Sequence, residues 1–220
     1  MKLPFKNRRD AGEMLASELA SMINATNVLV MALPRGGVPV AEPIAQRFGT
    51  PLSVLLVRKL GVPGQPELAL GAISENNVRV LNNEIVEALA LDALEIARIE
   101  QRERKELERR KQCYRSGSPL PRLSGKTVIL VDDGLATGAT MKAAIEVLKR
   151  SKVGTIVVAV PIAARETAIE IKRNIDRFVC LAQPHPFVAI GYWYEDFSQV
   201  SDDEVQDIIQ RHSFKFGHAT

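Results

Sequence analysis

The chain has 220 residues, of which 46% are hydrophobic and 25% charged, and its formal net charge is +3. This composition is typical of a soluble globular protein and excludes a collagen-like, disordered or membrane-embedded chain. The length suits one well-buried domain, and the charges are interspersed, so the small basic excess permits an anionic ligand without indicating nucleic acid.

The cysteines and the N-terminal stretch indicate in which cellular compartment the protein is expected. Cys113 and Cys180 lie far apart and show no Cys-x-x-Cys spacing, which predicts reduced thiols rather than a zinc site or a disulfide framework, with Cys180 in the core. The stretch "MKLPFKNRRDAGEML" lacks the apolar run of a signal peptide, and no later run reaches transmembrane length. We therefore expect a cytoplasmic protein with no membrane partner.

The first elements alternate between helical and strand patterns. Residues 8–22 carry apolar side chains at helical spacing and predict an amphipathic helix. An apolar run at 28–33 leads through "PRGG" into a helix over 38–48, and a second apolar run covers 53–57. Strand, glycine turn, helix and strand form a βαβ unit, which indicates a parallel sheet.

Two segments then interrupt this alternation. Residues 58–80 begin with many glycines and prolines and predict a flexible excursion with short strand-like pieces, "LALGAI" and "VRVL". Residues 83–112 predict one long helix that starts at an asparagine, and its second half carries opposite charges four residues apart. We interpret this helix as a solvated surface element rather than a nucleic-acid-binding one.

The βα pattern returns in the last part of the chain. Strands are expected at 127–131, 155–161 and 178–181, and helices at 138–149 and 165–172. Ser201 and Glu204 have capping-box spacing before a helix over 205–212. The fold class is therefore α/β, a doubly wound, mainly parallel sheet of about five strands with helices on both faces, whose ligands bind beyond the carboxyl ends of the strands.

The loop "VDDGLATGATM", residues 131–141, combines an anion-binding turn with two carboxylates. Gly134 and Gly138 permit a tight turn before a helix N-terminus, where backbone N–H groups hold a phosphate, and the ending is not that of a Walker A loop. Asp132 and Asp133 are suited to accept hydrogen bonds from sugar hydroxyls and to stabilise positive charge at the anomeric carbon. A ligand with both a phosphate and a ribose explains the combination.

The longer stretch "VILVDDGLATGATM" resembles the 5-phosphoribosyl 1-pyrophosphate (PRPP) motif of type I phosphoribosyltransferases, in the form of the adenine enzymes. The resemblance implies a Mg²⁺-dependent transfer of the phosphoribosyl group to a nitrogenous, purine-like base, with release of pyrophosphate. By this resemblance, Asp132 and Asp133 would be catalytic residues. The 5′-phosphate falls on Gly134, Leu135, Ala136, Thr137, Gly138, Ala139 and Thr140.

The length and the element pattern predict a single phosphoribosyltransferase-like domain over residues 1–220. A flexible-loop and long-helix excursion would occupy 58–124, and the long helix of 83–112 departs from the family's compact flexible loop. The resemblance implies a small hood element at 182–200 and, by analogy with the family, a homodimer.

Two stretches resemble the family's pyrophosphate-binding segments. In "LPRGG", Arg35 would supply charge and Gly36 and Gly37 exposed amides, and the Pro34–Arg35 bond is expected to be cis. In "VRKLGVPG", which resembles the approach to the catalytic loop of adenine phosphoribosyltransferases, Arg58 and Lys59 would reach the pyrophosphate.

The tail "FVAIGYWYEDFSQ" resembles the hood of 6-oxopurine phosphoribosyltransferases. Phe187 would stack on the base, with Val188 beside the edge of the base, and Asp196 would lie near Mg²⁺. For Phe187, ordinary core packing is an equal alternative.

The family's catalytic acids are missing from their usual positions. Ala136 stands where the 6-oxopurine enzymes have an aspartate, and the place of the adenine enzymes' glutamate is near Ala69. Glu67, two residues earlier and on the same face of a strand, is the candidate substitute. Two alternatives stay open: a non-catalytic PRPP- or nucleotide-binding regulator with a partner surface on 83–112, and another reaction on sugar phosphates, which no Gly-x-Ser-x-Gly elbow supports.

Overall fold

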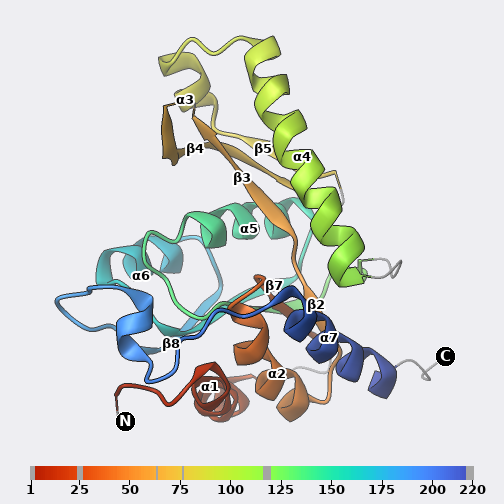
Figure 1. Cartoon of the computed structure of the whole chain (residues 1–220), viewed down its shortest axis with the longest axis vertical. Helices are drawn as coiled ribbons and strands as arrows, with labels where there is room; N and C mark the ends of the chain where they lie inside the picture. The colour runs from red at the N-terminus through yellow and green to blue at the C-terminus, as the bar shows by residue number, and fades with distance from the viewer. Residues whose placement is uncertain (1–2, 24–26, 63, 76, 116–119, 217–220) are drawn as a thin grey trace.

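The computed structural model describes residues 3–23, 27–62, 64–75, 77–115 and 120–216, with the backbone alone at 66–68, 115 and 213–216 (Figure 1). Its central sheet has the order β2-β1-β6-β7-β8, and all neighbouring strands are parallel. This confirms the expected α/β sheet. The strands are β1 (Val28–Ala32), β2 (Leu52–Val54), β6 (Thr127–Val131), β7 (Thr155–Ile162) and β8 (Arg177–Ala182).

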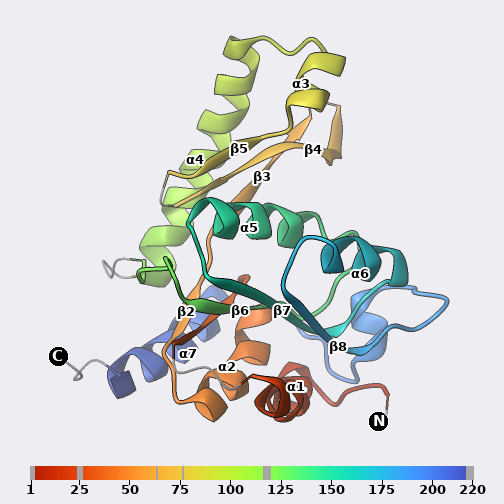
Figure 2. The same ribbon diagram turned by 180° about the vertical axis from the view of Figure 1, so that it is seen from behind.

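Helices cover both faces of this sheet. On one face lie α1 (Arg8–Met22), α2 (Gly37–Phe48) and α7 (Asp202–Phe216), and on the other α5 (Ala139–Arg150) and α6 (Arg165–Lys172) (Figures 1 and 2). Successive strand residues alternate between the two faces: Ile129 belongs to the core under α1 and α2, and Leu130 to the core under α5 and α6. Both faces are buried, which is why these strands read as continuous apolar runs.

Residues 57–62, 65–74 and 79–81 form a second sheet, whose strands cover the strand-like pieces expected at "LALGAI" and, from Arg79 on, at "VRVL"; the flexibility expected of 58–80 stays a prediction. Strands β3 (Val57–Val62), β4 (Gln65–Ser74) and β5 (Arg79–Leu81) pair antiparallel in that order. Leu60, Leu70 and Ile73 are fully buried, so apolar contacts stabilise this sheet. The apolar run at 53–57 also divides, because the chain leaves the parallel sheet after Val54 and enters β3 at Val57.

The single helix expected over 83–112 is two helices, α3 (Asn83–Ala88) and α4 (Ala93–Arg115). Asn82, one residue before the asparagine expected to start the helix, caps the first of them by accepting from the Ile85 N–H. The break follows from a second cap: the Asp92 side chain accepts from the Glu95 N–H at 2.7 Å, and Ala90 adopts a positive φ of 48°. Helix α4 stands against the second sheet, and its lower end reaches α7 (Figure 1).

The C-terminal part confirms the predicted cap, since the Ser201 hydroxyl accepts from the Glu204 N–H at 3.0 Å at the start of α7. Before α7, a short 3₁₀ helix, η1 (Ile190–Trp193), lies within the hood element. Both cysteines are free thiols, and Cys180 packs partly buried against the core under α5 and α6. Among the described residues, no helix is long and apolar enough to span a membrane.

Candidate functional site

The loop between β6 and α5 is fastened to the neighbouring elements through its own backbone. The Leu135 N–H donates to the Ile162 carbonyl at 2.9 Å, and the Leu135 carbonyl accepts from the Ala164 N–H at 2.8 Å. The Thr167 hydroxyl of α6 donates to the Ala136 carbonyl. These contacts set the loop's shape in the protein alone, so a ligand would find it preorganised.

A cavity of about 310 Å³ lies against this loop; we call it the phosphate-loop cavity. Gly138 has a left-handed φ of 67°, and α5 begins directly after it, so the first N–H groups of the helix face the cavity side. All seven residues predicted to hold a 5′-phosphate line it together. Its described lining is Lys59, Asp132, Gly134, Leu135, Ala136, Thr137, Gly138, Ala139, Thr140, Met141 and Ile190.

The two aspartates have different surroundings. Asp132 lines the phosphate-loop cavity. The Asp133 carboxylate instead accepts from Arg8 Nε of α1 at 2.8 Å, and its backbone carbonyl accepts from the Tyr194 hydroxyl at 2.6 Å. The Arg8 and Asp133 side chains are only 11% and 14% exposed, so this ion pair is a buried link between α1, the loop and the hood.

Burial raises the pKa of both carboxyl groups, and the neighbouring charge with the largest effect differs between them. Burial, followed by the charge of Asp133, raises the pKa of Asp132 well above its ordinary value. Burial also raises the pKa of Asp133, while the hydrogen bond and charge of Arg8 oppose that rise. The protein therefore bears a free-energy cost when Asp132 is ionised at neutral pH, a cost that a donor or a cation at the cavity would offset.

The "PRGG" segment packs directly on the two aspartates. A Cβ on Gly36 would lie 2.0 Å from Asp133 Oδ2, and one on Gly37 would lie 2.7 Å from the Val131 carbonyl oxygen. The Pro34–Arg35 bond is cis, as predicted. One expectation needs correction: the Gly37 N–H is not an exposed amide, because it donates to the Leu33 carbonyl at 3.1 Å.

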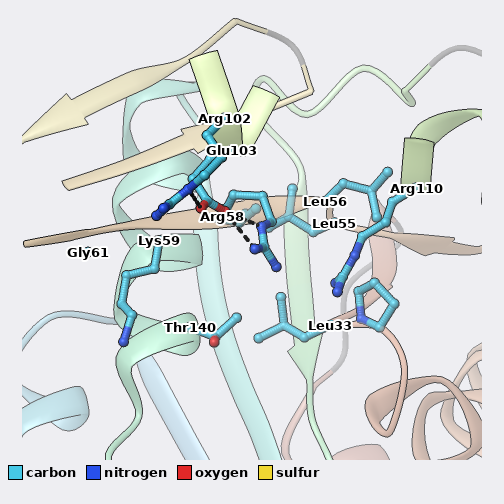
Figure 3. A pocket seen from close by; sticks show the side chains of 12 residues that line it. Leu33, Leu55, Leu56, Arg58, Lys59, Gly61, Arg102, Glu103, Arg110 and Thr140 are labelled. Atoms are coloured by element: carbon cyan, nitrogen blue, oxygen red, sulfur yellow. Dashed lines mark hydrogen bonds and ion pairs between the residues drawn. The ribbon is translucent and has the colours of Figure 1, made fainter. Parts of the chain in front are cut away.

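A second cavity, of about 440 Å³, adjoins the first and shares Lys59 and Thr140 with it; we call it the α4 cavity (Figure 3). Arg58 and Lys59 of β3 both line it, so the structure brings these two predicted residues together. Arg58 donates through Nη2 and Nε to Glu103 Oε2, at 2.6 and 2.9 Å. Its described lining is Leu33, Pro34, Leu55, Leu56, Val57, Arg58, Lys59, Gly61, Arg102, Glu103, Arg110 and Thr140.

Helix α4 supplies three of those residues, which corrects its interpretation as a purely solvated element. Arg102, Glu103 and Arg110 were missed by sequence reasoning because their charges were assigned to solvent. A signal existed in the helical spacing. The buried residues Ile96, Ile99, Glu103, Leu107 and Tyr114 recur every three, four or seven positions, and Arg110 falls on the same face.

A family model described as the phosphoribosyl transferase domain matches residues 6–196, which cover both cavities. The chain is a member of the type I phosphoribosyltransferase family. Two proteins named "Putative phosphoribosyl transferase", from Mycobacterium tuberculosis strains CDC 1551 / Oshkosh and H37Rv, are each 46% identical to it over 219 residues. Those alignments cover 100% of this chain and 49% of each relative, so the chain spans about half the length of these curated relatives.

The phosphoribosyltransferase fold also matches a solved structure closely. The crystal structure of TT1426 from Thermus thermophilus superposes with a TM-score of 0.87 at 41% sequence identity. The match covers 94% of this chain and 98% of that one. The match covers nearly all of both chains, so this architecture is shared with TT1426.

Arg35, which the family resemblance predicted to hold pyrophosphate, lies beside α7. Its Nη1 is 3.7 Å from Asp202 Oδ1, the oxygen that also accepts from the Tyr114 hydroxyl of α4. Among the described residues that line the two cavities, Pro34 is present and Arg35 is not. The structure thus does not bring Arg35 together with Arg58 and Lys59.

The predicted base- and metal-binding residues lie apart from the phosphate loop. Phe187 packs against the cluster of Phe5 and Tyr194, and Val188 is 65% exposed. From the described hood element, Ile190 is the residue that lines the phosphate-loop cavity. The packing alternative for Phe187 agrees with this placement, and base stacking stays a prediction.

Asp196 lies in another pocket, with Asn7, Arg8 and Ser198, and accepts from the Ser198 N–H at 2.9 Å. That hydrogen bond lowers its pKa. The structure does not bring Asp196 together with Asp132. Glu67 has its backbone in β4, but its side chain lies outside the described residues, so its catalytic assignment stays a prediction.

Proposed function

We propose that the protein transfers the 5-phosphoribosyl group of PRPP to a nitrogenous, purine-like base and releases pyrophosphate. One observation carries the proposal: Asp132 and the 134–140 loop line the same cavity. An acceptor-only carboxylate beside a helix N-terminus matches a molecule that presents vicinal hydroxyls next to a phosphate. The adjoining α4 cavity, with basic residues on its wall, suits the pyrophosphate end of the same molecule.

The residues suggest how the substrate is oriented. The backbone N–H groups of 134–140 hold the 5′-phosphate, and Asp132 accepts from the ribose hydroxyls. This arrangement directs the leaving group toward Lys59, which lines both cavities, and leaves the opposite face of the ribose to the acceptor.

In the transfer, the C1–O bond breaks and its electron pair leaves with the pyrophosphate. The lone pair of the acceptor nitrogen forms the C1–N bond, and the nitrogen's proton passes to solvent. The carboxylate of Asp132 lies near the ribose, where positive charge develops at C1, and so stabilises the transition state.

The donor set fits a magnesium ion that arrives with the substrate. In the described part of the chain, no three Asp, Glu, His or Cys side chains gather into a metal site. Mg²⁺ commonly binds through one or two carboxylates together with substrate phosphate oxygens and water, a role that Asp132 can fill. When bound, the ion would neutralise charge on the pyrophosphate.

A second candidate function is that of a regulator that binds PRPP without catalysing its conversion. Two observations favour it: Ala136 replaces a catalytic aspartate of the family, and the described lining of the phosphate-loop cavity has Asp132 as its acidic residue. The regulator would bind PRPP as the transferase does but would not release pyrophosphate. Measuring both binding and turnover therefore separates the two functions.

The test combines calorimetric titration of PRPP, with and without Mg²⁺, and an assay of pyrophosphate release against a panel of bases. Asp132→Asn should abolish binding, and Asp207→Asn, which changes an exposed aspartate of α7, serves as the matched control. Turnover with one base would establish the transferase and identify its acceptor. Binding without turnover would favour the regulator, and a wild-type protein that does not bind PRPP would overturn both.

A further inference from the structure

The face of helix α4 that borders the α4 cavity carries both apolar and charged residues. Ile99 and Leu107 of this face are buried in the core, and Glu103 and Arg110 lie between and beside them on the same face. This helix is therefore anchored by apolar contacts, and its charged residues are held at a set position over β3 rather than moving freely in solvent.

The basic side chains converge inside this cavity. Figure 3 shows the ends of Arg58 and Arg110 directed toward the space above Leu33, with Lys59 reaching down beside Thr140. Its described lining includes four basic residues and one acidic residue, Glu103. The floor contains Leu33, Leu55 and Leu56, and an apolar floor lowers the local dielectric constant and strengthens attraction for an anion.

We propose that Arg110, with Arg102 at the rim, completes the pyrophosphate site, so that α4 supplies part of the substrate-binding surface. This inference rests on the proposed function and adds residues to it. The α4 cavity shares Lys59 and Thr140 with the phosphate-loop cavity, so one PRPP molecule can extend from one into the other. Pyrophosphate carries several negative charges in a small volume, which matches clustered guanidinium groups.

Glutamates on α4 keep these arginines in position. Glu106 Oε1 accepts from Arg110 Nε at 2.8 Å, and Glu103 accepts from Arg58 and, at 3.3 Å, from Arg102 Nε. A guanidinium has five N–H donors, so a carboxylate on one edge leaves the opposite edge directed elsewhere. The hydrogen bonds from Arg109 and Arg110 lower the pKa of Glu106 to about 2, and this carboxylate stays ionised at neutral pH. Arg110 is thus a preorganised binding residue and Glu106 a positioning residue.

The test uses two probes that occupy different halves of the site. Inorganic pyrophosphate with Mg²⁺ reports on the α4 cavity, and ribose 5-phosphate reports on the phosphate loop. Both are titrated by calorimetry into the wild-type chain, Arg110→Gln and Arg102→Gln. Arg109→Gln is the matched control, because Arg109 also donates to Glu106, at 2.9 Å, and is absent from the described lining of the cavity.

We expect Arg110→Gln to weaken pyrophosphate binding about tenfold, since a hydrogen bond between charged groups is lost. Arg102→Gln, whose side chain is 76% exposed, should weaken it about twofold to threefold. Ribose 5-phosphate affinity should stay within about twofold in every variant, and Arg109→Gln should bind both probes like the wild type. Circular dichroism and thermal unfolding check that the variants fold.

The outcomes separate the two proposals. Wild-type binding of both probes with no change in Arg110→Gln would overturn the inference and leave the proposed function standing. Equal weakening by Arg109→Gln and Arg110→Gln would also overturn it, because it would indicate a general charge effect rather than a contact. A wild-type chain that binds neither probe would overturn the inference and the proposed function together.

Discussion

The two cavities differ in the kind of group that lines them: the first is lined largely by a backbone loop and the second largely by long side chains. The phosphate-loop cavity is lined largely by the consecutive residues 134–140, a loop whose backbone is fastened to β7 and α6. The α4 cavity has walls of long charged side chains that are held by ion pairs. A backbone wall permits little rearrangement without disturbing the sheet, whereas a side-chain wall can exchange one carboxylate partner for another.

This difference predicts a gradient in the effect of substitutions. Changes to the backbone wall or its buried supports should affect both stability and ligand binding strongly. Changes to the side-chain wall should affect ligand binding with little loss of stability, because partly exposed ion pairs contribute little to folding. The following variants test that contrast.

The largest effect is expected for Arg8→Met, which removes the cation beside Asp133. It leaves two buried carboxylates near each other and should lower the free energy of unfolding by about 3 kcal/mol, measured by urea unfolding at neutral pH. The deficit should shrink as pH falls through the raised pKa of Asp133, because a protonated carboxyl needs no cation. The double variant Arg8→Met/Asp133→Asn should recover part of the loss; strict additivity would show that the pair is not coupled.

Gly37→Ala tests the close packing of the "PRGG" segment. The new Cβ would lie 2.7 Å from the Val131 carbonyl oxygen and 3.0 Å from Asp132 Cα, both of them backbone atoms. We expect a loss of about 2 kcal/mol in stability and a clear loss of PRPP affinity.

The control for Gly37→Ala is Gly49→Ala. Gly49 has a positive φ of 58°, with no heavy atom of the described neighbours within 4 Å of its Cβ position. It should lose about 1 kcal/mol through backbone strain alone and keep its PRPP affinity. If both alanines weakened PRPP binding equally, close packing on Asp132 would not be the cause.

Asp132→Asn should stabilise the ligand-free protein while abolishing PRPP binding. The raised pKa of Asp132 means that its ionised form costs free energy, so the neutral amide should gain on the order of 1 kcal/mol near pH 8. The gain should decline as pH falls below that raised pKa and vanish only below the ordinary pKa of an aspartate, because between the two the carboxyl is neutral in the folded chain and still ionised in the unfolded one. Thermal unfolding across pH measures it, and a destabilised amide variant at pH 8 would contradict the prediction.

Glu103→Gln should have the smallest effect on folding. Arg58 is 30% exposed, and the amide keeps an oxygen that can accept from it, so stability should change by less than about 1 kcal/mol. Urea unfolding provides the comparison with Arg8→Met. A loss of stability as large as that of Arg8→Met would contradict the expected difference between the backbone wall and the side-chain wall.

The sequence predicted those parts of the molecule whose signals are local. The strands β1, β6 and β7 appear as continuous apolar runs because both faces of the sheet are covered. The phosphate loop is readable because its glycines, threonines and aspartates lie within 11 consecutive residues. The cis Pro34–Arg35 bond was expected from the resemblance.

The missed features depend on pairs that are distant in the chain. Arg8 meets Asp133 across 125 positions, and Arg58 meets Glu103 across 45. Charge spacing along α4 predicted intrahelical pairs correctly, as Glu106 and Arg110 show, and for that reason it concealed the pairs with β3. Helical periodicity of the buried residues was the better guide to which face of α4 meets the site.

The link between the start of α1 and the hood has a consequence for the order in which the site is completed during synthesis. The Phe5 N–H donates to the Trp193 carbonyl and the Glu195 N–H to the Phe5 carbonyl, while Arg8 reaches the Ser198 carbonyl across 190 positions. At ribosomal rates these partners emerge roughly 10 to 40 s apart. A nascent chain can therefore assemble β1, β6 and β7 before the Tyr194 hydroxyl reaches Asp133, and its phosphate loop gains this support only when the hood has been translated.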